Sequence, residues 1–137
     1  MLFEIKEDVN LNDMRHWDMA LMYIFADLCR FCQLHDSPLT ITSLISDRDN
    51  VLFTSRTHAE GRAFDIRTHH YSSVLQHKIV HHLNTKYKDW GAISSSDHKS
   101  RVAVLKPDHI HIQVRPNADI NRYIKEDVDG KKTCTNE

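Results

Sequence analysis

Apolar side chains recur at helical spacing near the start of the chain. The positions are Trp17, Leu21, Ile24, Phe25, Leu28, Phe31 and Leu34. This period predicts an amphipathic helix, because residues three and four apart share one face of an α-helix. Asn12 or Asp13 supplies a side chain able to cap the N-terminus of this helix, and Pro38 ends it.

A second stretch of the same kind begins at Ser72 or Ser73, either of which can cap a helix, and runs to about Tyr87. Its apolar residues, all expected to point inward, are Val74, Leu75, Ile79, Val80 and Leu83. A shorter amphipathic pattern predicts a further helix over 119–128. The polar composition of 129–137 predicts a flexible tail.

Four segments predict β-strands. Residues 39–45 are rich in β-branched side chains, and residues 62–67 alternate between polar and apolar. Residues 102–105 and 110–114 are separated by Lys106, Pro107, Asp108 and His109, where proline and aspartate favour a turn. This order of elements predicts an α+β fold: a single domain over 1–137, with a mostly antiparallel sheet and helices packed on it.

The composition limits the possible partners. The chain has 137 residues with 40% hydrophobic content, enough for one core, and 18 basic against 19 acidic residues. A net charge of -1 creates no global field that would recruit nucleic acid or an acidic membrane surface. Charges in the first eight residues break any secretory pattern, and no segment approaches the roughly 18 apolar residues of a membrane helix. We therefore expect a soluble cytoplasmic product without a signal peptide, and a monomer.

Three residues form a candidate zinc site. His58 and Asp65 lie on either side of Gly61, which can adopt positive φ and fold the chain back so that the two side chains converge. His111, on the last predicted strand, completes a set of two imidazoles and one carboxylate, which are suitable zinc ligands and leave one position open. If the turn at Pro107 directs it toward the metal, Asp108 is the candidate general base. His109 would orient Asp108, bind an oxyanion or replace one ligand.

The segment Thr57 to Ile66 reads T-H-A-E-G-R-A-F-D-I, which resembles the H-x-x-G-x-A-x-D signature of the D-Ala-D-Ala metallopeptidases and the phage L-alanyl-D-glutamate endolysins. The resemblance covers about residues 39–114. It implies that His58 and Asp65 are zinc ligands, and that the acid-x-x-His element from Asp108 to His111 supplies the base and the third ligand.

The same resemblance implies a function. The expected activity is hydrolysis of amide bonds in peptidoglycan stem peptides, of the D-Ala-D-Ala carboxypeptidase or L-alanyl-D-glutamate endopeptidase type, by a zinc enzyme that acts on the cell wall after release. An upstream arginine of the family binds substrate or polarises the scissile carbonyl, and Arg48 is the candidate for that role.

An alternative resemblance leads to a different function. The hedgehog signalling domain shares the fold and zinc triad of these peptidases, and Glu60 to Ala63 and His109 to His111 are similar to its motifs. Membership of that group would imply a zinc-stabilised binding domain without peptidase turnover. Asp108, at the peptidase position for the base, favours the enzyme.

Other reactive residues have simpler interpretations. Cys29 and Cys32 form a C-x-x-C pair within the first predicted helix, and we expect partly buried helix residues there instead of a redox or zinc site. His77 and His81 are four apart on the second helix without the glutamate of an HExxH motif, so a solvated helix face is expected. Arg62 is expected to face solvent.

Overall fold

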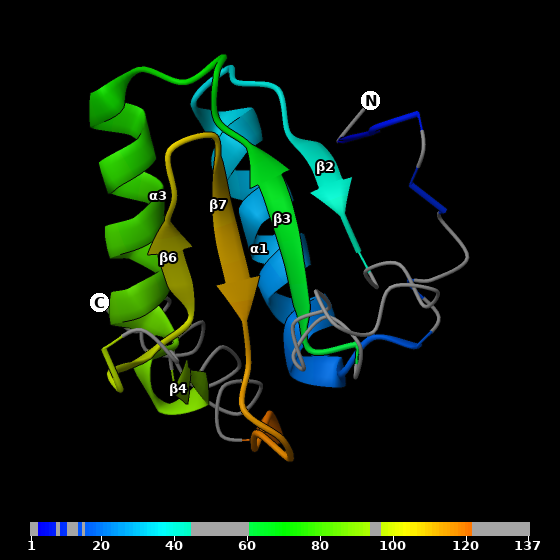
Figure 1. Ribbon diagram of the computed structural model, residues 1–137, viewed down its shortest axis with the longest axis vertical. Coiled ribbons are helices and arrows are strands. Elements are labelled where there is room, and N and C mark those ends of the chain that lie inside the picture. The colour runs from blue at the N-terminus through cyan, green and yellow to red at the C-terminus, as the bar shows by residue number, and fades with distance from the viewer. Residues whose placement is uncertain are drawn as a thin grey trace, which may run out of the picture.

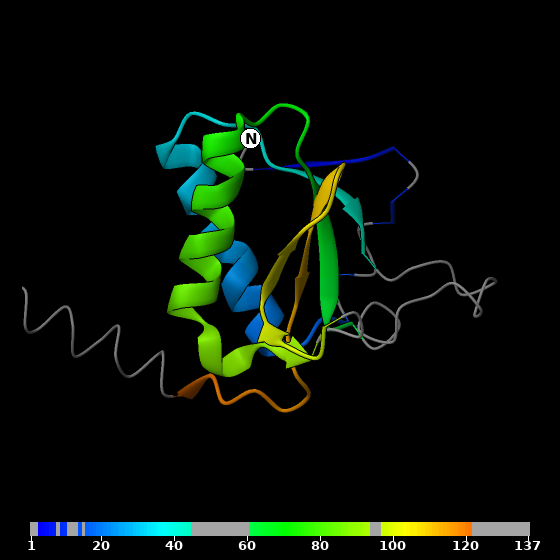
Figure 2. The same ribbon diagram turned by 60° about the vertical axis from the view of Figure 1, so that its left-hand side comes forward.

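The computed structural model describes residues 3–7, 9–10, 14, 16–44, 61–93 and 97–121. Two layers make up this part of the chain: a five-stranded sheet and two helices, α1 and α3, that cover one of its faces (Figures 1 and 2). The sheet is antiparallel at every pairing except the first. The expected α+β class, with helices on a mostly antiparallel sheet, is confirmed.

Helix α1 runs from Met19 to Leu34 and buries the apolar stripe that its sequence predicts. Its N-cap is Asp18, whose carboxylate accepts a hydrogen bond from the backbone N–H of Ala20 at 2.9 Å. The prediction that Asn12 or Asp13 caps this helix is therefore wrong. The cap lies closer to the first buried turn because the backbone N–H of Asp18 is itself held by the carbonyl of Gly61 at 2.9 Å.

Helix α3 runs from Ser73 to Lys86, and Ser72 caps it by accepting a hydrogen bond from the N–H of Leu75. Ile79 and Leu83 are fully buried, as predicted. Val74, by contrast, is 66% exposed, which corrects the expectation that it points inward. Val74 lies on the side of α3 that points away from the core, whereas Leu75 in the same turn packs against it.

The sheet has the order β1-β2-β3-β7-β6. The strands are β1 (Glu4–Ile5), β2 (Thr40–Ser43), β3 (Ala63–Arg67), β6 (Ala103–Leu105) and β7 (His109–Gln113). The predicted hairpin is β6 and β7, whose turn is closed by the N–H of Lys106 donating to the carbonyl of His109 at 2.8 Å. Strand β1 has two residues and pairs with β2 in parallel. Two residues are too few for a detectable alternation, so the sequence pattern missed it.

A short segment after α3 forms a second, two-stranded sheet. It contains the 3-10 helix η2 (Lys88–Trp90), β4 (Ala92–Ile93) and β5 (Ser100–Arg101). The sequence pattern does not predict these strands, because each has only two residues. The indole of Trp90 is buried and donates to the carbonyl of Asp119 at 2.9 Å. Neither Asp119 nor Ile120 is helical, so the helix predicted over 119–128 does not begin where expected, and 122–128 lie outside the described residues.

The core lies between the sheet and the helices. Phe64 and Ile66 on β3 and Ile110 and Ile112 on β7 are fully buried there. The ring of Phe64 stacks on Trp17 with centroids 4.8 Å apart. Because successive side chains of a strand point to opposite faces, burying these residues turns the polar residues between them to the other face of the sheet. Among the described residues, no helix is both long and apolar enough to cross a bilayer.

Candidate metal centre

Asp65 and His111 are cross-strand neighbours. Antiparallel pairing of β3 with β7 sets them directly opposite each other, although they are 46 residues apart in the chain. His111 Nδ1 lies 2.9 Å from Asp65 Oδ1. Their side chains are 14% and 15% exposed, so each is largely shielded from water but still reachable from the face opposite the helices. The structure thus brings together two of the three predicted ligands.

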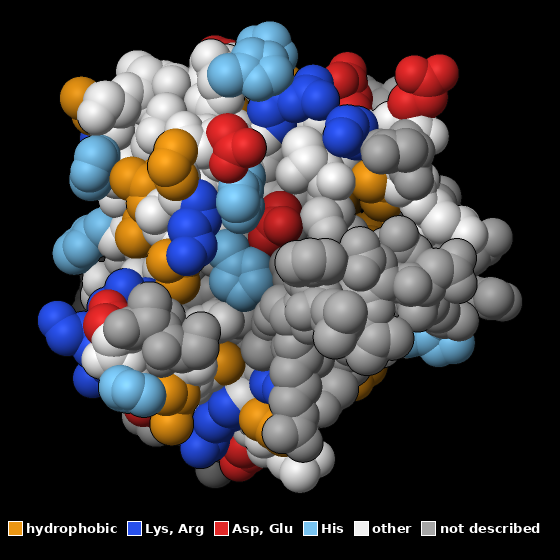
Figure 3. Space-filling view, in the orientation of Figure 1, with side chains coloured by type: hydrophobic (Ala, Val, Ile, Leu, Met, Phe, Trp, Pro, Cys, Tyr) orange, Lys and Arg blue, Asp and Glu red, His pale blue; other side chains and the backbone are white. Residues whose placement is uncertain are grey.

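His109 lies on the same strand face as His111, as the two-residue spacing predicts. Its Nε2 is 3.9 Å from Asp65 Oδ2, and its Nδ1 is 2.6 Å from Asp108 Oδ1. Asp65 therefore stands between two imidazoles, one near each carboxylate oxygen. Figure 3, which looks onto this face of the sheet, shows histidine side chains gathered around an acidic one.

Asp108 lies in the β6–β7 turn, and its side chain is 88% exposed. Its carboxylate is held by His109. The hydrogen bond from His109 and the charge of that imidazole keep the pKa of Asp108 below its ordinary value of 3.8, although the nearby Asp65 opposes this effect. Asp108 is therefore ionised at neutral pH, which is the state a general base requires.

Gln113 extends this row of polar groups and was not predicted as a site residue. Its Oε1 lies 3.0 Å from His111 Nε2, and its Nε2 donates to the carbonyls of Ala92 and Arg101, each at 3.1 Å. Its position two residues after His111 on a strand was the available signal, because such residues share a strand face. Only the fold shows that the short strands β4 and β5 reach its amide.

Gly61 makes the turn before β3 that the sequence predicts. Its φ is +71°, in the region that favours glycine. A Cβ at this position would overlap the carbonyl oxygen of His16 and lie 3.0 Å from the carbonyl carbon. The residue type is therefore required twice, once for the backbone conformation and once for the close approach of the segment before α1.

Arg62 is buried, which corrects the expectation that it faces solvent. Its guanidinium donates from Nη1 to the carbonyl of Val114 at 2.6 Å, and the N–H of Val114 donates to the carbonyl of Arg62 at 2.9 Å. These contacts tie the start of β3 to the end of β7. They fix the register that places Asp65 opposite His111.

His58 and Arg48, the remaining predicted ligand and the predicted substrate-binding arginine, lie outside the described residues. Within the part of the chain that the structure describes, no three His, Cys, Asp or Glu side chains gather closely enough to hold a metal ion. The described half of the site nevertheless has suitable chemistry. Carboxylate oxygens and imidazole nitrogens are groups of the kind that bind zinc in proteins.

Cys29, Cys32, His77 and His81 lie in helices, as the sequence predicts. Cys29 and Cys32 are buried in α1, and burial raises the pKa of Cys29 to about 11, so this thiol is protonated and unreactive at neutral pH. His77 and His81 are exposed on α3, and His77 Nδ1 is bonded to the carbonyl of Ser73 in its own helix.

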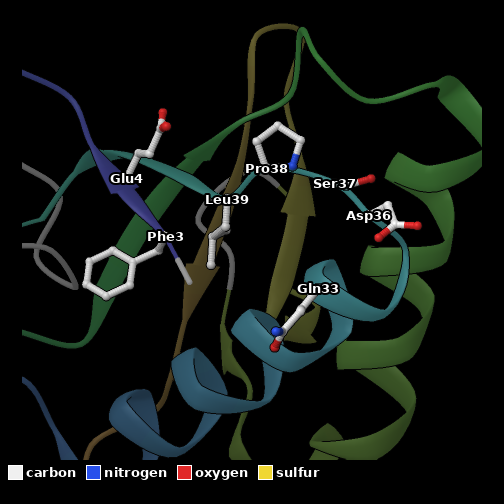
Figure 4. Close-up of a pocket in the computed structure, with 7 residues that line it drawn as sticks. All are labelled: Phe3, Glu4, Gln33, Asp36, Ser37, Pro38 and Leu39. Carbon is white, nitrogen blue, oxygen red and sulfur yellow. The ribbon is translucent and has the colours of Figure 1, made fainter. Parts of the chain in front are cut away.

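A cavity of about 330 Å³ opens elsewhere, between β1 and the end of α1 (Figure 4). Phe3, Gln33 and Leu39 line it, and Figure 4 shows the carboxylates of Glu4 and Asp36 on opposite sides of it. Its lining contains none of the predicted site residues. It holds no converging pair of polar side chains, and we assign it no role in the site on the sheet.

Comparison of the chain with protein-family models, with curated proteins and with solved structures found no match.

Proposed function

We propose that this protein is a zinc-dependent peptidase that hydrolyses amide bonds in peptidoglycan stem peptides, with a fold of the kind shared by the D-Ala-D-Ala metallopeptidases and the hedgehog signalling domain. The observation that carries the proposal is the Asp65–His111 pair. One residue comes from the H-x-x-G-x-A-x-D string and the other from the distant acid-x-x-His element, and their ligand atoms lie 2.9 Å apart. Two accidental motif matches would not be expected to lie side by side in the fold.

Asp65 and His111 would hold the ion together with His58. When bound, zinc polarises a carbonyl and lowers the pKa of a coordinated water to about 7. Asp108 would serve as the general base, accepting a proton from the attacking water and giving it to the departing amine. His109 holds the carboxylate of Asp108 through its Nδ1, at 2.6 Å, and so would limit the directions in which this base can point.

The substrate assignment follows from the resemblance. A peptidoglycan stem peptide is acidic, and Arg48 is our candidate for the upstream arginine of the family that binds substrate or polarises its carbonyl. The setting that we propose is a phage-type endolysin that reaches the wall after release from the cell. The bond cleaved is a D-Ala-D-Ala or an L-alanyl-D-glutamate linkage.

Metal content tests the site. Wild-type protein that is loaded with zinc and then dialysed to remove the excess is expected to retain one equivalent of zinc per chain. His111→Ala and Asp65→Ala should retain far less. His77→Ala is the matched control, because His77 is exposed and lies on α3. Full zinc retention by His111→Ala would remove this residue from the site and contradict the proposal.

Incubation with purified peptidoglycan, followed by mass analysis of the fragments, tests the activity. Asp108→Asn separates the peptidase from the hedgehog-like binding domain. It should keep zinc while hydrolysis falls by about 100-fold or more, as expected for loss of a general base. Asp119→Asn, another exposed carboxylate, is the control. A wild-type protein that holds zinc but releases no wall fragments would favour the binding domain instead.

A further inference from the structure

The orientation of the Gln113 amide is settled by its surroundings. Its nitrogen donates to two backbone carbonyls, those of Ala92 and Arg101, and a carbonyl can only accept. The side-chain oxygen must therefore point the other way, toward His111 Nε2 at 3.0 Å. Gln113 is 5% exposed, so water does not compete freely for these groups. A flipped amide would set its oxygen against two carbonyl oxygens.

This orientation selects one form of the His111 ring. Because the Gln113 oxygen accepts, His111 Nε2 must carry a proton to bond it. With Nε2 held by Gln113, Nδ1 is the ring nitrogen that can bind a metal ion. That nitrogen faces the Asp65 carboxylate oxygen at 2.9 Å. A carboxylate can only accept, so in the metal-free protein this contact requires a proton on Nδ1, and a metal ion bound by both groups would replace that proton.

We propose that Gln113 is a positioning residue that holds His111 with its Nδ1 lone pair directed at the metal. This inference rests on the proposed function and adds to it the residue that sets the geometry of one ligand. The second ring nitrogen of a metal-binding histidine is commonly held by a hydrogen-bond acceptor, which fixes the tautomer and the ring orientation. Here the acceptor is a neutral amide from the same strand.

The small sheet of β4 and β5 holds the Gln113 side chain in this orientation. It supplies both carbonyls that hold the Gln113 amide, one from each strand. Gly91, just before β4, permits the close packing, since a Cβ there would lie 2.8 Å from the backbone nitrogen of Arg101. The strands that sequence analysis missed thus act on the metal site through a single side chain.

Zinc affinity measured by competition with a chromophoric chelator tests the role. Gln113→Met has similar length and volume but cannot accept the His111 proton, and its affinity should fall about 10- to 100-fold, the usual effect of losing such a partner. Gln33→Met is the matched control, because Gln33 is exposed on α1, and it should bind zinc as the wild type does. Circular dichroism and thermal melting check that both variants fold.

Nitrogen NMR of the His111 ring in the zinc-loaded wild type provides a test that needs no variant. We expect a proton on Nε2 that exchanges slowly with water, and Nδ1 bound to the metal. Metal on Nε2, or equal affinity of folded Gln113→Met and wild type, would overturn the positioning role and leave the peptidase proposal standing. A wild-type protein that binds no zinc would overturn both.

Discussion

Replacing Gly61 with alanine changes the turn that leads into β3 and therefore the position of Asp65. The native φ of +71° places residue 61 in the left-handed region. An alanine there costs about 1–2 kcal/mol from the contact between its Cβ and the adjacent backbone. The added Cβ also overlaps the carbonyl of His16, and the relevant atoms are backbone, which cannot rotate away as a side chain would.

The overlap of the added Cβ with the His16 carbonyl is the second contribution to the loss of stability. It resembles overpacking of a core, which costs about 1–3 kcal/mol. The two together lower the free energy of unfolding by roughly 2–5 kcal/mol. Domains of ordinary stability have about 5–15 kcal/mol in total, so the variant is expected to fold but to be strongly weakened. The hydrogen bond from the N–H of Asp18 to the carbonyl of Gly61 would be strained as well.

Urea denaturation followed by tryptophan fluorescence measures this effect. With a slope of about 1–3 kcal/mol per molar urea, the midpoint should fall by roughly 1–2 M. Asn117→Ala is the matched control, because Asn117 also has positive φ, +56°, but is exposed. It should lose only about 1 kcal/mol, from the conformational effect alone. Equal losses in the two variants would refute the reasoning that the His16 backbone excludes a side chain at residue 61.

Two further predictions concern pH and metal. Burial of Asp27 raises its pKa, but the donors Tyr87, His82 and Lys86 outweigh burial and lower it below 3.8 in the folded protein. The stabilisation is therefore present above the unfolded pKa of about 3.9 and is lost as pH falls through the folded value. Asp27→Asn should cost about 1–3 kcal/mol at pH 7, and its difference from wild type should shrink below about pH 4 in urea titrations; a constant difference would contradict this. Zinc at about 100 times its Kd should stabilise the folded protein by about 2.7 kcal/mol and raise Tm by roughly 10 °C, whereas His111→Ala should show no such rise.

Sequence patterning predicted most of the fold. The stripe from Trp17 to Leu34 is enough to identify α1, because helical period is visible within a few turns. The start of α1 was harder to place. Several side chains before the helix can cap it, and Asp18 was selected by its contact with Gly61, far along the chain. The two-residue strands β1, β4 and β5 contain too few positions for any period to appear.

The candidate site divides in a similar way. The motif identified Asp65 and His111, and alternation along β7 placed His109 on the same face as His111. Gln113 was missed because its role depends on carbonyls from two strands that are invisible in the sequence. Arg62 was assigned to solvent because arginines that flank a strand usually face it, and only the fold shows Val114 accepting its hydrogen bond in the interior.

The sequence by itself therefore determined the helical stripes, the alternation in β3 and β7 and the glycine turn before β3. Each is a property of neighbouring residues governed by local sterics and by a short period. The tertiary structure decided that the carboxylate oxygen of Asp65 faces the Nδ1 of His111. The Asp65–His111 distance depends on a strand register set 46 residues apart, and the form of the His111 ring depends on an amide held by β4 and β5. Such contacts exist only after the sheet is assembled. They depend on the strand register, because a shift of one residue in the pairing of β3 with β7 would turn these polar groups into the core.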